Sequence, residues 1–180
     1  MNGPERIARS RPAWQWSPWV IGCELIGASL LLIAPVRATT ITNTFTVQAV
    51  INASCNVSAT TLNFGTYDPA SGTALTGSST VNVFCTSGTA YTAALSVGTG
   101  GGSFTTRTVA SGGNTLNYNL YRDSARSQVW GDGTGSTFTV SGTGSGVLTA
   151  NPLTVYGQMP TAQDGPPGTY TSTITVTVTF

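Results

Sequence analysis

The clearest pattern in the sequence is the alternation of side-chain types over residues 169–180. Every odd position from 169 to 179 is threonine, while apolar residues recur at even positions. These apolar residues are Ile174, Val176, Val178 and Phe180. Because successive side chains of a strand point to opposite faces, the pattern predicts a strand with one apolar and one hydroxyl face. No further strand follows in the sequence, so we predict an open edge whose backbone groups are free to pair with another chain.

Residues 39–53 show the same alternation near the other end of the chain. Most even positions carry threonine, and the apolar residues at odd positions are Ile41, Phe45, Val47, Ala49, Ile51 and Ala53. The pattern predicts a second amphipathic strand. Fully extended, the stretch before Cys55 would span about 50 Å, which is more than a typical strand needs. Part of it is therefore expected to leave the domain; the alternative is that it folds back as the first strand of its own domain.

Short apolar runs separated by turns occupy the sequence between these two ribbons. Glycine, serine, proline and aspartate mark the turns, and no amphipathic helix of useful length is present. The predicted strands lie at residues 61–67, 79–86, 91–97, 104–109, 116–121, 128–130, 138–141 and 147–159. Short strands at this spacing indicate an all-β domain, built as a sandwich or a barrel.

The first 38 residues have the features of a secretory signal peptide. Three arginines precede an apolar run at 19–34, and small side chains follow at positions 36 and 38. Two alternatives are an uncleaved membrane anchor and a lipoprotein site at Cys23. The run is interrupted by Glu24 and is short for a bilayer span of about 20 residues, and its most apolar part follows the cysteine. We therefore expect cleavage before Thr39 and export of the remainder.

Removal of residues 1–38 leaves two cysteines, Cys55 and Cys85. An even number of cysteines in an exported protein predicts a disulfide; the alternative is a pair of free thiols. In the chain-entropy description, a disulfide closing a loop of this length stabilises the fold by roughly 3–4 kcal/mol.

Charged residues are scarce beyond position 38, where three arginines stand against four aspartates without lysine, histidine or glutamate. This excludes the concentrated positive field that nucleic-acid binding requires. It also removes the side chains that usually serve as general bases near neutral pH. Asp132 lies in a DGTGS stretch that supplies too few acidic ligands for calcium and predicts a tight turn. We expect no catalytic residues, no metal and no cofactor.

Several motifs, in order along the chain, resemble the spore coat protein U domain family. They are FGTYD at 64–68, VFCT at 83–86, LNYNLYRD at 116–123, WGDG at 130–133, VYG at 155–157, GTY at 168–170 and the closing TVTF. Members often carry aspartate where this chain has Ser172. The family includes subunits of archaic chaperone–usher pili of Gram-negative bacteria. The resemblance implies an immunoglobulin-like β-sandwich that is incomplete because its last strand is supplied by another molecule.

The resemblance also implies a function and a set of site residues. The chain is expected to be a pilus subunit that polymerises by donor-strand complementation and serves surface adhesion and biofilm formation. Its expected partners are other subunits, a periplasmic chaperone and an outer-membrane usher, on an export route through the periplasm to the cell surface. Residues 39–50 would form the donor-strand extension, anchored by Ile41, Phe45, Val47 and Ala49, and 51–180 the pilin domain. Ile174, Val176, Val178 and Phe180 would form the acceptor edge and the chaperone contact.

Two other functions fit the same sequence. The first is a secreted spore-coat or cell-surface matrix protein that uses the same domain without forming ordered fibres. The second is a binding module for sugars or surface ligands, which depends on exposed aromatic residues such as Trp130. Aromatic residues of this kind more often belong to the core of a sandwich.

Overall fold

The computed structural model describes residues 35–180, so nearly all of the predicted signal peptide lies outside the described residues. The chain divides into two units, Met1–Thr46 and Val47–Phe180, and each is considered by itself. In the first unit, residues 35–46 carry no helix or strand and all of their side chains are exposed. Across residues 35–180, no helix is long and apolar enough to span a bilayer.

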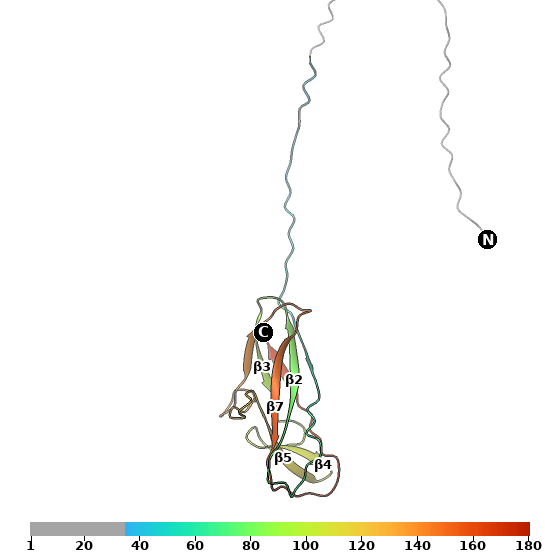
Figure 1. The fold of residues 1–180 in the computed structure, drawn as a ribbon. Helices are drawn as coiled ribbons and strands as arrows, with labels where there is room; N and C mark the ends of the chain where they lie inside the picture. Colours follow the sequence, from blue (N-terminus) through green and yellow to red (C-terminus); the bar gives the residue numbers. More distant parts are fainter. Residues whose placement is uncertain (1–34) are drawn as a thin grey trace, which may run out of the picture. The chain divides into compact units, whose positions relative to one another are not determined.

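The second unit is an all-β domain of two sheets (Figure 1). Its strands are β1 (Cys55–Ala59), β2 (Leu75–Cys85), β3 (Ala90–Leu95), β4 (Arg107–Ser111), β5 (Asn114–Tyr121), β6 (Val140–Thr143), β7 (Asn151–Met159) and β8 (Val176–Thr179). One sheet has the order β1-β2-β7-β5-β4 and the other β6-β3-β8. All ladders between these strands are antiparallel. The predicted all-β sandwich is confirmed.

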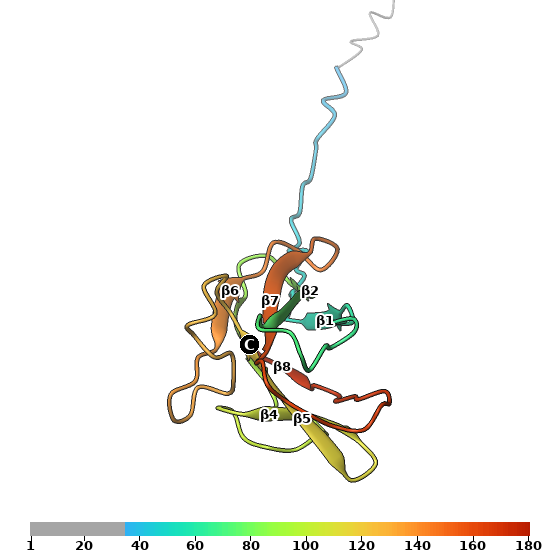
Figure 2. The same ribbon diagram turned by 60° about the horizontal axis from the view of Figure 1, so that its bottom comes forward.

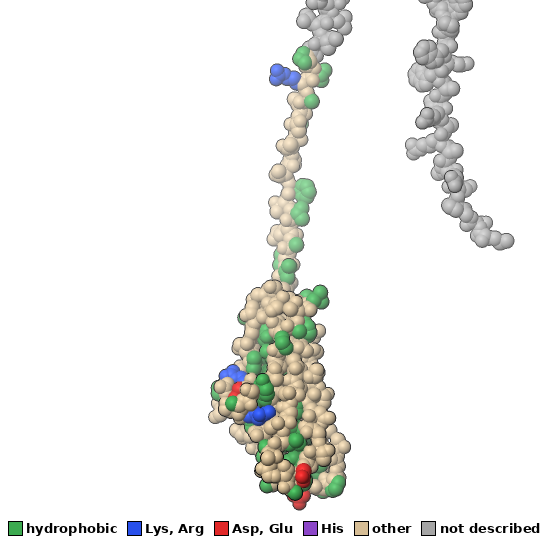
Figure 3. Space-filling view, in the orientation of Figure 1, with side chains coloured by type: hydrophobic (Ala, Val, Ile, Leu, Met, Phe, Trp, Pro, Cys, Tyr) green, Lys and Arg blue, Asp and Glu red, His purple; other side chains and the backbone are tan. Residues whose placement is uncertain are grey.

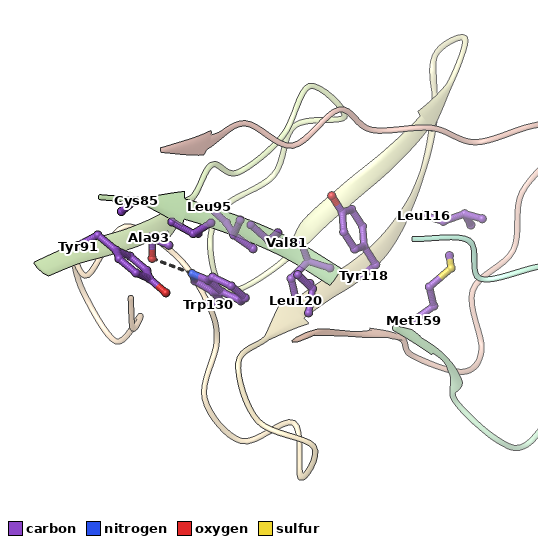
Figure 4. Packing of buried hydrophobic residues seen from close by; sticks show 12 residues of the cluster. Val81, Cys85, Tyr91, Ala93, Leu95, Leu116, Tyr118, Leu120, Trp130 and Met159 are labelled. Carbon is purple, nitrogen blue, oxygen red and sulfur yellow. Dashed lines mark hydrogen bonds between the residues drawn. The ribbon is translucent and has the colours of Figure 1, made fainter. Parts of the chain in front are cut away.

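Alternation within the strands builds the core between the two sheets. In β2 the odd positions Val81, Val83 and Cys85 point inward and are at most 2% exposed. They are met from the second sheet by Ala93 and Leu95 of β3, which are equally buried. Figure 4 shows Cys85, Ala93, Leu95 and Val81 of this cluster near one another. Burying side chains of this size contributes about 1.5–3 kcal/mol each for the larger ones, so the core rather than any local propensity holds the sheets together.

Trp130 is fully buried at the centre of this core. Its indole Nε1 donates a hydrogen bond to the carbonyl oxygen of Ala93 at 3.0 Å (Figure 4). The indole is thus both packed and satisfied, as a buried tryptophan requires. A surface-binding role for Trp130 is therefore wrong, because no part of the side chain reaches solvent.

The disulfide between Cys55 and Cys85 is present. The two cysteines are opposite each other in the β1–β2 ladder, which continues to Ala59 opposite Val81. The prediction of a disulfide is confirmed. It fastens the first strand of the domain to the end of β2, directly after the exposed N-terminal segment.

Arg107, at the start of β4, is completely buried. Its Nε donates to the carbonyl oxygen of Ser96 at 3.0 Å, and its two terminal nitrogens donate to Asn119 Oδ1 and the Trp130 carbonyl oxygen, each at 2.7 Å. The guanidinium also lies 5.4 Å from the centre of the Phe104 ring. Burial lowers the pKa of this guanidinium. Carbonyl and amide oxygens, rather than a carboxylate, compensate for its desolvation.

Several predicted strands differ from the structure. Residues 128–130 form only isolated bridges, at Val129 and Trp130, and the strand predicted at 147–159 begins at Asn151 after a turn. Residues 39–53 form no strand, and the first strand is instead β1 at Cys55–Ala59. Residues 61–67 also form no strand, and the C-terminal ribbon has ladder pairing only at Val176–Thr179. For residues 39–53, residues 61–67 and the C-terminal ribbon, the physical reason is shared: alternation shows that a segment is able to pair, but a ladder needs a neighbouring edge to pair with.

Candidate strand-acceptor groove

The C-terminal ribbon has one paired edge and one open edge. β8 pairs with β3, with Val176 opposite Leu95 and Thr179 opposite Thr92, and it is the last strand of its sheet. Before β8, the carbonyl oxygens of Thr173 and Thr175 accept hydrogen bonds from Thr99 and Ser96 on the same side. No strand of the described domain pairs with the other edge of β8.

The backbone groups on that open edge belong to the apolar positions of the ribbon. In an antiparallel pair, the N–H and C=O of one residue point to the same side, and the side alternates along the strand. Since the threonines at 173 and 175 bond toward β3, the backbone groups of Ile174, Val176 and Val178 face the open edge. Their side chains are half-buried against the core, whereas Phe180 is 58% exposed.

Residues 60–67 lie opposite this open edge. The C-terminal ribbon and residues 60–67 form the two walls of a groove. Thr60 still extends the β1–β2 pairing, through its N–H to the Thr80 carbonyl oxygen. The chain then leaves the ladder, and the side chains of Leu62 and Phe64 pack against the core cluster. Figure 2 shows β1 and β8 near each other in the domain.

A pair of glycines allows the segment 60–67 to pass over the inward face of the five-stranded sheet. Gly77 of β2 and Gly157 of β7 are opposite each other in the ladder, on the inward face of the sheet. A Cβ on Gly157 would lie 2.8 Å from Phe64 Cζ and 2.9 Å from Leu62 Cδ1. On Gly77 it would lie 3.3 Å from Leu62 Cδ2. The missing side chains therefore leave the space that Leu62 and Phe64 occupy.

Between the two walls runs a groove of about 980 Å³. Core residues of the five-stranded sheet form its floor: Val81, Leu116, Tyr118, Leu120, Val155 and Met159. Four of them, Leu116, Tyr118, Leu120 and Met159, are seen together in Figure 4. The Phe64 ring meets Tyr118 edge-on, with 6.1 Å between ring centres. The groove is therefore lined by apolar side chains and flanked by two stretches of unpaired backbone, a shape that an amphipathic strand fits.

One floor residue carries an unsatisfied polar atom. The Tyr118 hydroxyl is buried and has no hydrogen-bond partner within the described part of the chain. The nearby Ser172 Oγ accepts a hydrogen bond from Gly100 N–H at 3.0 Å. Burial raises the pKa of Tyr118, so the hydroxyl stays protonated and neutral at ordinary pH.

The predicted donor anchors are exposed in the structure. Ile41 is 94%, Phe45 88% and Val47 83% exposed, and Ala49 is exposed as well. The predicted acceptor residues Ile174, Val176 and Val178, by contrast, lie together along one wall of the groove or its continuation. The sequence does not predict the other wall, residues 60–67. The LNF run at 62–64 is typical of a short strand, and nothing in it indicates that the segment passes over the sheet.

The polar chemistry of the domain is that of turns. Asp132 Oδ1 accepts hydrogen bonds from the hydroxyl and the N–H of Thr134, and these bonds hold the pKa of Asp132 below its usual value. Asp123 likewise accepts from the N–H groups of Ser127 and Gln128. Among residues 35–180, no cluster of three or more histidine, cysteine, aspartate or glutamate side chains is placed to hold a metal.

Comparisons with known proteins identify a family. The family model described as "Spore Coat Protein U domain" matches residues 41–177. "Protein U" of Myxococcus xanthus is 34% identical over 171 residues, which cover 85% of this chain and 92% of that protein. Among solved structures, a chain of the CsuC–CsuE chaperone–tip adhesion subunit pre-assembly complex of archaic Csu pili from Acinetobacter baumannii matches at 23% identity and a TM-score of 0.48. That match covers 72% of this chain and 40% of the solved chain.

Proposed function

Because this chain belongs to the spore coat protein U domain family, whose members are structural proteins of coats and pili, we propose that it is the structural subunit of a pilus and polymerises by donor-strand complementation. Residues 39–50 of one copy, the N-terminal extension, fill the acceptor groove of the next copy. The observation that carries this proposal is the open edge of β8 beside an apolar groove.

Extension and groove are complementary in pattern. The extension alternates apolar and hydroxyl side chains, so a strand in the groove turns Ile41, Phe45, Val47 and Ala49 to the floor and its threonines to solvent. Its backbone pairs with the groups left open at Ile174, Val176 and Val178. Burying the three larger anchors contributes roughly 5–9 kcal/mol before the cost of ordering the strand is subtracted.

The geometry of such a contact produces a fibre. The extension and the groove are different surfaces of one chain, so the contact is head-to-tail and each added copy leaves a new unused surface. A subunit with an open groove also needs protection before assembly, because an unpaired edge above apolar side chains promotes aggregation. We assign that protection to a periplasmic chaperone, which occupies the same edge, and the exchange to an outer-membrane usher. The finished pilus would serve surface adhesion and biofilm formation.

A coat or matrix protein is the second candidate. It is favoured by the match to Protein U over 92% of that protein's length. Electron microscopy of material shed from expressing cells separates the two functions, since a pilus gives thin fibres and a matrix protein gives amorphous layers. The same donor-strand contact can operate in either assembly, so the microscopy tests the kind of structure and not the contact.

The contact itself is tested with Phe45→Asp and its matched control Thr46→Asp. A carboxylate at position 45 would be buried against the apolar floor, which is too costly without a partner, whereas position 46 faces solvent. We expect Phe45→Asp to abolish the polymer ladder on unheated gels and Thr46→Asp to leave it intact. Polymers of normal length from Phe45→Asp, or from a chain lacking residues 39–49, would overturn the proposal.

A further inference from the structure

The turn between β6 and β7 presents two aliphatic side chains at its tip. The N–H of Thr149 donates to the carbonyl oxygen of Gly146 at 3.0 Å, which closes a tight turn around Val147 and Leu148. Leu148 is 95% exposed and Val147 54% exposed. The central positions of tight turns usually carry glycine, proline, asparagine, aspartate or serine, so local structure gives no reason for a valine and a leucine there.

This turn lies close to Ser54, the last residue between the N-terminal extension and β1; Ser54 is called the root of the extension below. The N–H of Gly146 donates to the Cys85 carbonyl oxygen at 3.0 Å. The next residue, Thr86, exchanges hydrogen bonds with Ser54, through its own N–H at 2.9 Å and through its hydroxyl oxygen at 3.0 Å. The disulfide of Cys85 with Cys55 fixes the same point. Turn and root therefore share one end of the domain, where β2 ends and β7 begins (Figure 1).

Chain length then determines what meets the turn. If the extension through residue 50 lies in the groove of the next copy, residues 51–54 alone connect that copy to β1. Four extended residues reach at most about 14 Å. The next copy is thus held against the end of the domain that carries Val147 and Leu148.

From this, resting on the proposed function, we propose that Val147 and Leu148 form a second contact between successive copies, against the rim of the next copy's groove. Every ladder of the domain is antiparallel. A strand added antiparallel to β8 leaves the groove at the end lined by Pro166 and Pro167. Both prolines are exposed and offer apolar surface to the turn. The second contact restrains the angle between copies, which four connecting residues alone do not.

Cysteine labelling tests the contact. Leu148→Cys and the control Ala125→Cys, an exposed residue in the loop between β5 and β6, are assembled into polymers and treated with a maleimide. We expect Cys at 148 to react at least tenfold more slowly in polymers than in the chain lacking residues 39–49, and Cys at 125 to react equally in both. Equal reaction of position 148 in both forms, or protection already in the truncated chain, overturns the contact.

The two proposals fail separately. If residues 39–49 prove dispensable for polymers, donor-strand complementation is wrong, and the labelling of position 148 in those polymers still decides whether the turn is covered. If Phe45→Asp blocks assembly, but Leu148→Cys in polymers of the full-length chain reacts with the maleimide as fast as in the truncated chain, only the second contact is wrong. As a further readout, Leu148→Asp should leave polymer length unchanged and at least halve the bending persistence length of the fibres in electron micrographs. An unchanged persistence length contradicts the restraint on the angle.

Discussion

At the scale of single residues, the shape of the groove depends on side chains that are absent. Gly77 and Gly157 face each other across β2 and β7, and the wall of the groove crosses the sheet over them. Any Cβ at position 157 would push Phe64 and Leu62 outward. The glycines are therefore part of the groove even though an incoming strand need not touch them.

We expect Gly157→Ala to lower the free energy of unfolding by about 1–2 kcal/mol, since overpacking costs about 1–3 kcal/mol and reduced chain entropy offsets part of it. The matched control is Gly72→Ala, whose Cβ would meet no atom within 4 Å. It should be neutral or stabilising by up to about 1 kcal/mol. Urea unfolding of both variants measures the difference; equal midpoints would show that the wall does not depend on the glycine pair.

At Gly77 and Gly157 a missing side chain leaves space, whereas at Arg107 a large charged side chain is buried in the core. Arg107→Met leaves the carbonyl oxygens of Ser96 and Trp130 without their side-chain donor and removes one of the two donors to Asn119 Oδ1. We expect a loss of about 3–5 kcal/mol. Arg107→Lys keeps the charge but cannot reproduce the planar fork, so its loss should be smaller but still measurable. Thermal unfolding ranks the three proteins, and a methionine variant as stable as wild type would contradict a structural role for the guanidinium.

The residue scale is also where sequence reasoning was least complete. Alternation correctly placed Ile174, Val176 and Val178 on the half-buried face of the ribbon, because their faces follow from the period alone. It gave no sign that Arg107 is buried, since the acceptors that satisfy it come from distant segments. Trp130 would have been an exposed aromatic only under the binding-module alternative; its burial at the centre of the core agrees with the expectation that such residues belong to the core of a sandwich.

At the scale of elements, the two ends of the chain behave differently despite similar patterns. The C-terminal ribbon forms β8 because β3 offers it an edge, whereas residues 39–53 form no strand. Their sequences alone predict strands in both places. The difference is one of available partners, which a single chain's alternation does not encode, and it is the reason that the boundaries of the first strand were wrong.

The disulfide belongs to this scale because it joins β1 to β2. We expect the double variant Cys55→Ser/Cys85→Ser to be less stable by roughly 3–4 kcal/mol, according to the chain-entropy description. Guanidinium unfolding measures the change. An intact mass two units below that of the reduced chain provides the direct check that the bond forms, and an unchanged unfolding midpoint in the double variant would contradict its stabilising role.

At the scale of the whole molecule, the domain presents a nearly uncharged surface. Only a few acidic and basic groups interrupt the face seen in Figure 3. Burial of apolar anchors and pairing of backbone groups depend little on salt, whereas contacts between exposed charges are screened within about 10 Å at 0.1 M. We therefore expect assembly rates to change less than twofold between 0.05 and 0.5 M sodium chloride, measured by light scattering. A steep decrease with salt would point to charged contacts instead.

Under the proposed donor-strand contact, each chain would carry both an open groove and the segment that fills its neighbour's groove, which would give the polymer a direction. Whatever its length, such a polymer would display an unfilled groove at one tip and an unused N-terminal extension at the other, so the two tips would be chemically distinct. A subunit that lacks the extension could occupy only the tip with the unused extension. A soluble peptide copied from residues 39–50 should bind the unfilled groove at the opposite tip and halt elongation there.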